Sequence, residues 1–127
     1  KLKTLEELWR QDRIEEPLIC LPPEETIARN FQAGLAKLGV DWPVSIQVNS
    51  LELIESYVAN GFGLGVSVAF PQPTSQRPVR VLPLHGFKAV GVAAFWQGKL
   101  NPITKALLDE VHLRAQFLRN QEQSAGK

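Results

Sequence analysis

In the first part of the chain, apolar positions follow helical spacing, then strand spacing, then helical spacing again. Thr4 begins a Thr-Leu-Glu-Glu sequence that can form a capping box, which predicts a short helix ending near residues 11–13. The apolar run between Pro17 and Pro22 is typical of a buried strand. The next helix is predicted to have Pro22 and Pro23 in its first turn and to end at Gly39. Its apolar stripe comprises Ile27, Phe31, Leu35 and Leu38.

The middle of the chain repeats this alternation. Residues 44–48 alternate between apolar and polar side chains, which predicts a second strand. Ser50 is a suitable N-cap for a helix that ends at Asn60 and Gly61. The apolar stripe of that helix comprises Leu51, Ile54, Tyr57 and Val58. Residues 66–70 predict a third strand, and the Pro- and Ser-rich residues after it predict a loop.

The last part of the chain predicts two more strands and a helix. Residues 79–82 and 87–96 have the composition of strands. Asn101, followed by a proline, begins an amphipathic helix that is predicted to end near residue 119, and residues 120–127 are expected to form a flexible polar tail. Because helices alternate with strands, the sequence predicts a three-layer α/β/α fold, in which helices cover both faces of a mostly parallel, mixed sheet.

Composition restricts the classes of protein to which the chain can belong. Its 127 residues, 44% hydrophobic and 21% charged, suit one globular domain. The formal net charge of +1 gives no strong attraction to nucleic acid or to an anionic membrane. A single cysteine excludes an internal disulfide, which favours the reducing cytoplasm. No apolar run could span a bilayer, and the start lacks a signal-peptide pattern. Because the chain begins with Lys1, we expect it to be part of a longer protein.

Most residues that could carry catalysis have a simpler structural explanation. Gly61, Gly63 and Gly65 follow a helix and open a strand, the reverse of a dinucleotide-binding turn, so a helix cap, a tight turn and close packing are favoured. Cys20 lies in an apolar strand, which favours a buried, inert thiol. Neither histidine has a second ligand at metal-binding spacing. With no serine nucleophile elbow and no phosphate loop, the sequence indicates no metal, no cofactor and no enzyme.

The carboxyl ends of the predicted parallel strands form the best candidate binding site, because ligands of open α/β sheets bind there. Two of these ends are also helix N-termini, where free N–H groups attract a small anion. At the first of them, Glu24 and Glu25 would complement the helix dipole. The candidates are Pro22, Pro23, Glu25 and Thr26 after the first strand, Asn49 and Ser50 after the second, and Phe70 after the third. Ser50 alone is best explained as a helix cap. For the cluster, a pocket wall and an ordinary sheet rim are equally supported.

The order of these segments resembles the effector-binding domain of LysR-type transcriptional regulators over residues 2–118. The most recognisable part is a helix followed by a Gly-Phe-Gly-Leu-Gly turn and an entering strand. The resemblance is carried by residues 4–8 before Pro17, by residues 31–39, 48–58 and 60–66, and by residues 95–111.

This resemblance implies the fold of type 2 periplasmic binding proteins, with a small-molecule effector bound between two α/β lobes. Residues 14–86 would form the second lobe, and residues 87–119 would return to the first lobe, whose initial part would precede Lys1. The resemblance also implies a separate N-terminal winged helix-turn-helix that binds promoter DNA, and a homo-oligomeric full-length protein. Effector contacts would come from residues 22–26 and from Asn49 and Ser50, with Phe70 as a weaker candidate.

Two alternatives stay open from the sequence. A solute-binding protein of the same fold would work outside the cytoplasm and would need a signal peptide upstream. A small α/β enzyme would need a catalytic constellation that the sequence does not show. The leading hypothesis is the ligand-sensing part of a transcriptional regulator that binds a small, anionic metabolite.

Overall fold

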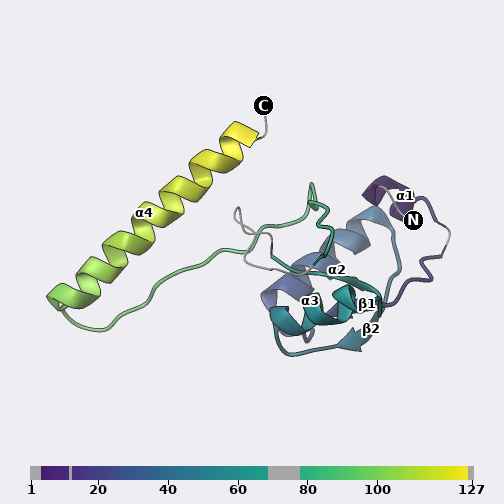
Figure 1. The fold of residues 1–127 in the computed structure, drawn as a ribbon, viewed down its shortest axis with the longest axis horizontal. Coiled ribbons are helices and arrows are strands. Elements are labelled where there is room, and N and C mark those ends of the chain that lie inside the picture. Colours follow the sequence, from purple (N-terminus) through teal and green to yellow (C-terminus); the bar gives the residue numbers. More distant parts are fainter. Residues whose placement is uncertain (1–3, 12, 69–77, 126–127) are drawn as a thin grey trace. The chain divides into compact units, whose positions relative to one another are not determined.

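The computed structural model describes residues 4–11, 13–68 and 78–125 (Figure 1). They fall into two compact units, of which the first holds described residues up to 68 together with residues 78–90, and the second holds residues 91–125. The division lies after Val90, and the Phe87 ring packs against the aromatic core of the first unit. The expected lobes, residues 14–86 and 87–119, stay a prediction.

The first unit contains three helices and a parallel sheet among its described residues (Figure 1). In chain order its elements are α1 (Leu5–Trp9), β1 (Leu18–Cys20), α2 (Thr26–Leu38), β2 (Val44–Gln47), α3 (Leu51–Ala59) and β3 (Leu64–Gly65). The strand order is β2-β1-β3, and both pairings are parallel. Helices connect the parallel strands, as the alternating pattern predicted, so the first unit has an α/β fold.

The core of the first unit lies on both faces of β1. Leu18 and Cys20 pack with Phe31 and Leu35 of α2, whereas Ile19 packs in a second cluster that includes Ile54 of α3. Alternate residues of a strand point to opposite faces, so each face of β1 has its own helix. All three strand residues are fully buried, which confirms the buried strand predicted from its uninterrupted apolar run.

The three glycines after α3 serve a turn at Gly61 and close packing at Gly63 and Gly65. Gly61 has a positive φ of 78° directly after the C-cap Asn60. A methyl group at Gly63 would collide with the Pro17 carbonyl, which accepts a hydrogen bond from the Leu64 N–H at 2.9 Å. A methyl group at Gly65 would collide with the side chains of Ile54 and Val58 on α3. The predicted helix cap, tight turn and close packing are therefore confirmed.

Side chains cap three of the helices as predicted. Thr4 Oγ1 accepts a hydrogen bond from the Glu7 N–H at 3.3 Å, and Ser50 Oγ accepts one from the Leu53 N–H at 3.2 Å. Asn101 Oδ1 accepts from the Thr104 N–H at 2.8 Å. These bonds satisfy donors that a helix N-terminus otherwise leaves open.

The start of α2 corrects the prediction that the prolines form its first turn. The Glu25 N–H donates to the Pro22 carbonyl at 2.9 Å, so residues 22–25 form a separate turn, and the helix begins at Thr26. Pro23 stands second in this turn, where its fixed φ is favoured. Glu24 and Glu25 consequently precede the helix, and its first turn carries no acidic residue.

The strand predictions at residues 66–70, 79–82 and 87–96 were wrong where the structure describes them. The third strand is confined to Leu64–Gly65, and residues 66–68 and 78–96 contain no strand. Residues 69 and 70 lie outside the described residues. A β-rich composition forms a strand only with a partner, and no described strand pairs with these segments. The mixed sheet that they implied is therefore not formed among the described residues.

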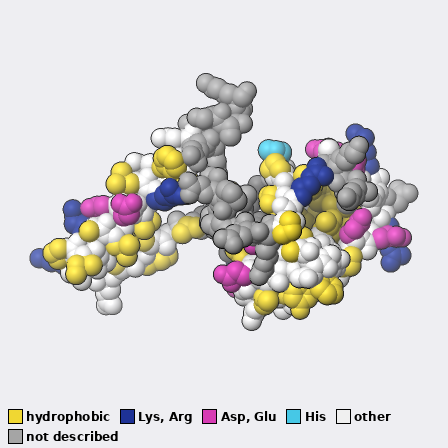
Figure 2. Space-filling model, in the orientation of Figure 1, with side chains coloured by type: hydrophobic (Ala, Val, Ile, Leu, Met, Phe, Trp, Pro, Cys, Tyr) yellow, Lys and Arg dark blue, Asp and Glu magenta, His cyan; other side chains and the backbone are white. Residues whose placement is uncertain are grey.

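The second unit consists of an extended segment and α4 (Pro102–Ala125). The helix continues past the predicted end near residue 119. Large apolar side chains of this amphipathic helix are exposed, with 83% of Ile103 and 65% of Leu107 accessible, and Figure 2 shows hydrophobic side chains spread over this unit. Phe95, on the segment before it, is 93% exposed. No described helix is long and apolar enough to cross a membrane.

Candidate functional site

The ends of β1 and β2 bring most of the predicted site residues to one edge of the sheet. Cys20 is in register with Gln47, and the Val48 N–H donates to the Cys20 carbonyl at 3.0 Å. The segments that follow the two strands therefore start side by side. We call the candidates on these segments the rim: Pro22, Pro23, Glu25, Thr26, Asn49 and Ser50. Phe70, the seventh candidate, lies outside the described residues.

The α2 side of the rim is open to solvent. Pro22 is half-buried, whereas Pro23, Glu25 and Thr26 are exposed. Glu25 is the N-cap residue, with an extended backbone, and its side chain makes no capping hydrogen bond. The first-turn N–H groups of α2 are thus not satisfied by that side chain and can donate to a ligand or to water.

Arg29 adds a positive charge to this side of the rim. One of its guanidinium nitrogens donates to Thr26 Oγ1 at 3.3 Å, and both residues are exposed. The sequence interpretation missed Arg29, although its position three residues after Thr26 places the two on one face of a helix that starts there. The Thr26 hydroxyl and the Arg29 guanidinium together can bind a carboxylate.

The α3 side of the rim is chemically different. The hydroxyl of the half-buried Ser50 caps its own helix through the Leu53 N–H, so the favoured structural role of Ser50 is confirmed. Asn49, which follows β2 at the same edge of the sheet, is exposed. The Ser50 hydroxyl thus satisfies one N–H group in the first turn of α3, whereas the Glu25 side chain satisfies none in α2.

Cys20 lies beneath the rim at the end of β1. The side chain is fully buried, and burial raises the pKa of the thiol above its ordinary value, with the Leu21 backbone N–H opposing part of the rise. A thiol with a raised pKa is mostly protonated near neutral pH and is a poor nucleophile. Its position confirms the predicted buried cysteine.

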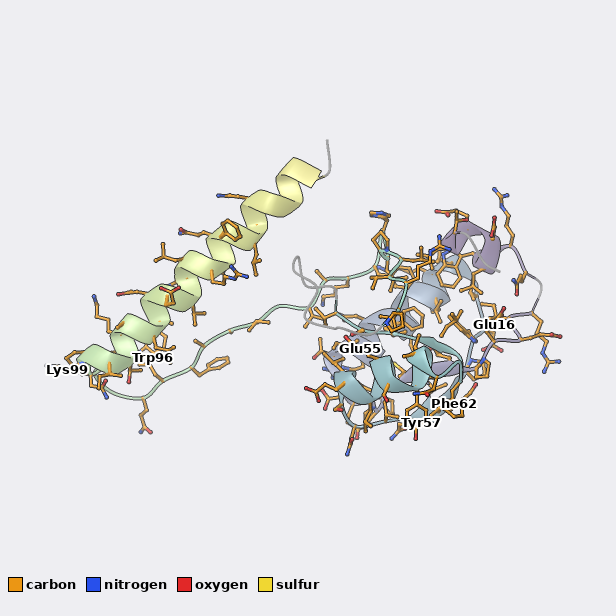
Figure 3. All side chains as sticks on the ribbon, in the orientation of Figure 1. Glu16, Glu55, Tyr57, Phe62, Trp96 and Lys99 are labelled. Carbon is orange, nitrogen blue, oxygen red and sulfur yellow. The ribbon has the colours of Figure 1, made fainter. Side chains whose placement is uncertain are left out.

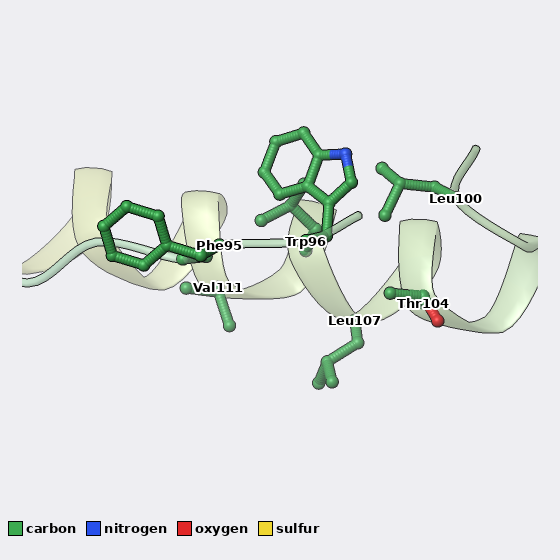
Figure 4. A pocket seen from close by; sticks show the side chains of 8 residues that line it. Phe95, Trp96, Leu100, Thr104, Leu107 and Val111 are labelled. Atoms are coloured by element: carbon green, nitrogen blue, oxygen red, sulfur yellow. The ribbon is translucent and has the colours of Figure 1, made fainter. Parts of the chain in front are cut away.

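The second unit contains a hollow of different character (Figure 4). It lies between the segment before α4 and the helix itself, and it is almost entirely apolar. The side chains that line it are Ala94, Phe95, Trp96, Leu100, Thr104, Leu107, Leu108 and Val111. The Thr104 hydroxyl and the Trp96 indole N–H are the only polar side-chain groups among these residues, so the hollow suits apolar packing better than a charged metabolite.

Comparison with known proteins identifies the family. A family model described as the LysR substrate binding domain matches residues 4–116, from the cap of α1 into the later turns of α4. No curated protein and no solved structure gives a significant match. Domains of this family have a periplasmic-binding-protein-like α/β fold and serve transcription regulation by binding small-molecule effectors. The chain therefore belongs to the LysR substrate-binding domain family.

Proposed function

We propose that the chain is the effector-sensing part of a cytoplasmic LysR-type regulator and that it binds a small organic anion at the rim. The observation that carries this proposal is the open N-terminus of α2 at the carboxyl end of β1, in a chain of this family. In α/β folds this position is the usual place for a ligand, and the helix terminus favours negative charge.

The charges around the rim favour one carboxylate over a highly charged anion. Arg29 and the N–H groups of α2 attract negative charge, but the exposed Glu24 and Glu25 lie beside the same turn. These carboxylates repel additional negative charge at short range. A monocarboxylate, or a dicarboxylate whose second group points away from the turn, is the ligand class that this arrangement fits.

The rim supplies one wall of the proposed site. Because Thr26 and Asn49 are exposed, a ligand there needs a second surface to exclude water. We propose that this surface is the first lobe, to which residues 87–119 contribute a returning segment and helix. Promoter DNA would be bound by a winged helix-turn-helix elsewhere in the full-length regulator, which would act as a homo-oligomer. The family match favours this regulator over a solute-binding protein.

A thermal-shift screen of the full-length regulator tests the proposal. The panel contains aliphatic and aromatic mono- and dicarboxylates, each paired with its neutral amide. A carboxylate present at one hundred times its Kd stabilises the folded state by about 2.7 kcal/mol, which corresponds to a Tm rise of roughly 5 °C or more for a domain of this size. We expect such a rise with at least one carboxylate and not with its amide. Equal shifts with the acid and the amide would contradict an anion site.

A further inference from the structure

The segment that leaves the first unit packs along one stripe of α2. We call residues 84–90 the strap. Its Phe87 ring stacks on Phe31 at a centroid distance of 5.5 Å and on Trp9 at 6.2 Å. The ring also fills the space above Gly34, where a methyl group would collide with it. Phe87 therefore anchors the strap to α2, and its ring fits there because Gly34 has no side chain.

The Asn30 side chain forms hydrogen bonds with the strap next to the Phe87 ring. Its Nδ2 donates to the backbone carbonyls of Lys88 at 3.2 Å and of Ala89 at 3.3 Å. Asn30 and Gly34 are four residues apart on a helix, so they lie on the same face. Two adjacent carbonyls of the strap thus depend on one side chain of α2.

Leu84, at the start of the strap, also packs against the core cluster, but the residues after Phe87 are weakly attached. Lys88, Ala89 and Val90 are exposed, and no backbone–backbone hydrogen bond joins residues 84–90 to a helix or strand in the described part of the chain. A segment with few buried contacts opens at a lower free energy than the core. The division between the two units lies immediately after Val90.

We propose that the strap is a releasable tether. Asn30 and Phe87 hold it against α2 in one state, and in the other state both contacts are lost while β1, α2 and α3 stay folded. Release would lengthen the free connection between the two units by the length of the strap. This tether is separate from the proposed effector binding, because its release needs no ligand.

Trypsin gives a direct assay of the tether. Trypsin cleaves after lysine, and the carbonyl of the Lys88–Ala89 peptide bond accepts one of the two Asn30 hydrogen bonds. Cleavage after Lys88, Lys37 and Lys99 is followed by mass spectrometry on the full chain. Lys37 lies in the last turn of α2 and reports opening of that helix, and Lys99 lies before α4 and reports the activity of the protease (Figure 3).

We expect Asn30→Ala to raise the initial cleavage rate at Lys88 about tenfold, because two hydrogen bonds of ordinary strength are lost from the attached state. Cleavage at Lys37 and Lys99 should not change. Gly34→Ala should also accelerate cleavage at Lys88, because it displaces the Phe87 ring.

Gln32→Ala is the matched control. It removes another side-chain amide of α2, which donates to the Trp42 carbonyl at 3.4 Å and not to the strap. Cleavage at Lys88 should be unchanged in this variant. The tether would be overturned by an Asn30→Ala protein cleaved at the wild-type rate, by an equal rise at Lys37, or by wild-type cleavage at Lys88 as fast as at Lys99.

Discussion

Glu25 and Ser50 are both N-cap residues, but they differ in whether their side chains satisfy N–H groups of the helix that follows. Ser50 accepts a hydrogen bond from its own helix, whereas Glu25 makes no capping bond. The sequence predicted two helix N-termini at this edge of the sheet and favoured Ser50 as a cap. It did not reveal that Glu25 would be the N-cap residue of α2, because the start of α2 depends on the turn at residues 22–25. The N-terminus of α2 therefore has no side-chain cap, whereas that of α3 has one.

Ser50→Ala tests the structural role of this residue. We expect the free energy of unfolding to fall by about 1 kcal/mol, because the Leu53 N–H loses its capping partner. Urea denaturation measures the change. Ser67→Ala, at an exposed position outside the helices and strands, is the control and should change stability by less than about 0.5 kcal/mol. Equal stability of the two variants would show that the cap contributes nothing.

Gly65→Ala tests the close packing of β3 on α3. The added methyl group would meet Ile54, and it would lie 2.8 Å from Val58 Cγ2, so the helix must shift. We expect a loss of about 1–3 kcal/mol in the free energy of unfolding, the usual cost of overpacking a core. At Gly91, an added methyl group has no neighbour within 4 Å. Gly91→Ala should therefore be nearly neutral, and similar losses in the two variants would refute the packing argument.

At the scale of elements, periodicity predicted the helices well and the later strands badly. The helices α2 and α3 are set by local spacing and caps, which are visible in the sequence. Residues 87–96 alternate as a strand does, but strand formation depends on a partner at a distance. In the structure Phe87 packs on α2, and Val92 is 97% exposed. The same limit applies to α4. Periodicity identified its apolar face but could not show what would cover that face.

Phe95→Ala tests whether the full-length regulator covers the second unit. In the 127-residue chain the ring is 93% exposed, so we expect a change below about 0.5 kcal/mol in the free energy of unfolding. In the full-length regulator the remainder of the first lobe should bury the ring, and the same change should cost about 3 kcal/mol. Lys99→Ala is the control and should be neutral in both proteins. A neutral Phe95→Ala in the full-length protein would contradict a shared first lobe.

At the scale of the whole molecule, the order of elements predicted the family and the parallel sheet, and the family match bears out that resemblance. One feature was beyond the sequence. Residues 87–90 belong to the first unit, where the Phe87 ring fits over Gly34, which is a long-range contact. Arg29 was missed, although its spacing from Thr26 places both residues on one face of α2.

The central claim is that the rim binds the effector of a LysR-type regulator. Isothermal titration calorimetry tests it most directly, with the carboxylate that stabilises the full-length regulator most in the screen. Thr26→Ala removes a rim hydroxyl, and Thr104→Ala makes the same change on α4 as a control. We expect Thr26→Ala and Asn49→Ala each to raise the Kd about tenfold, the usual cost of one hydrogen bond to a charged ligand, with Thr104→Ala unchanged. A Kd equal to that of the wild type in both rim variants would contradict the claim.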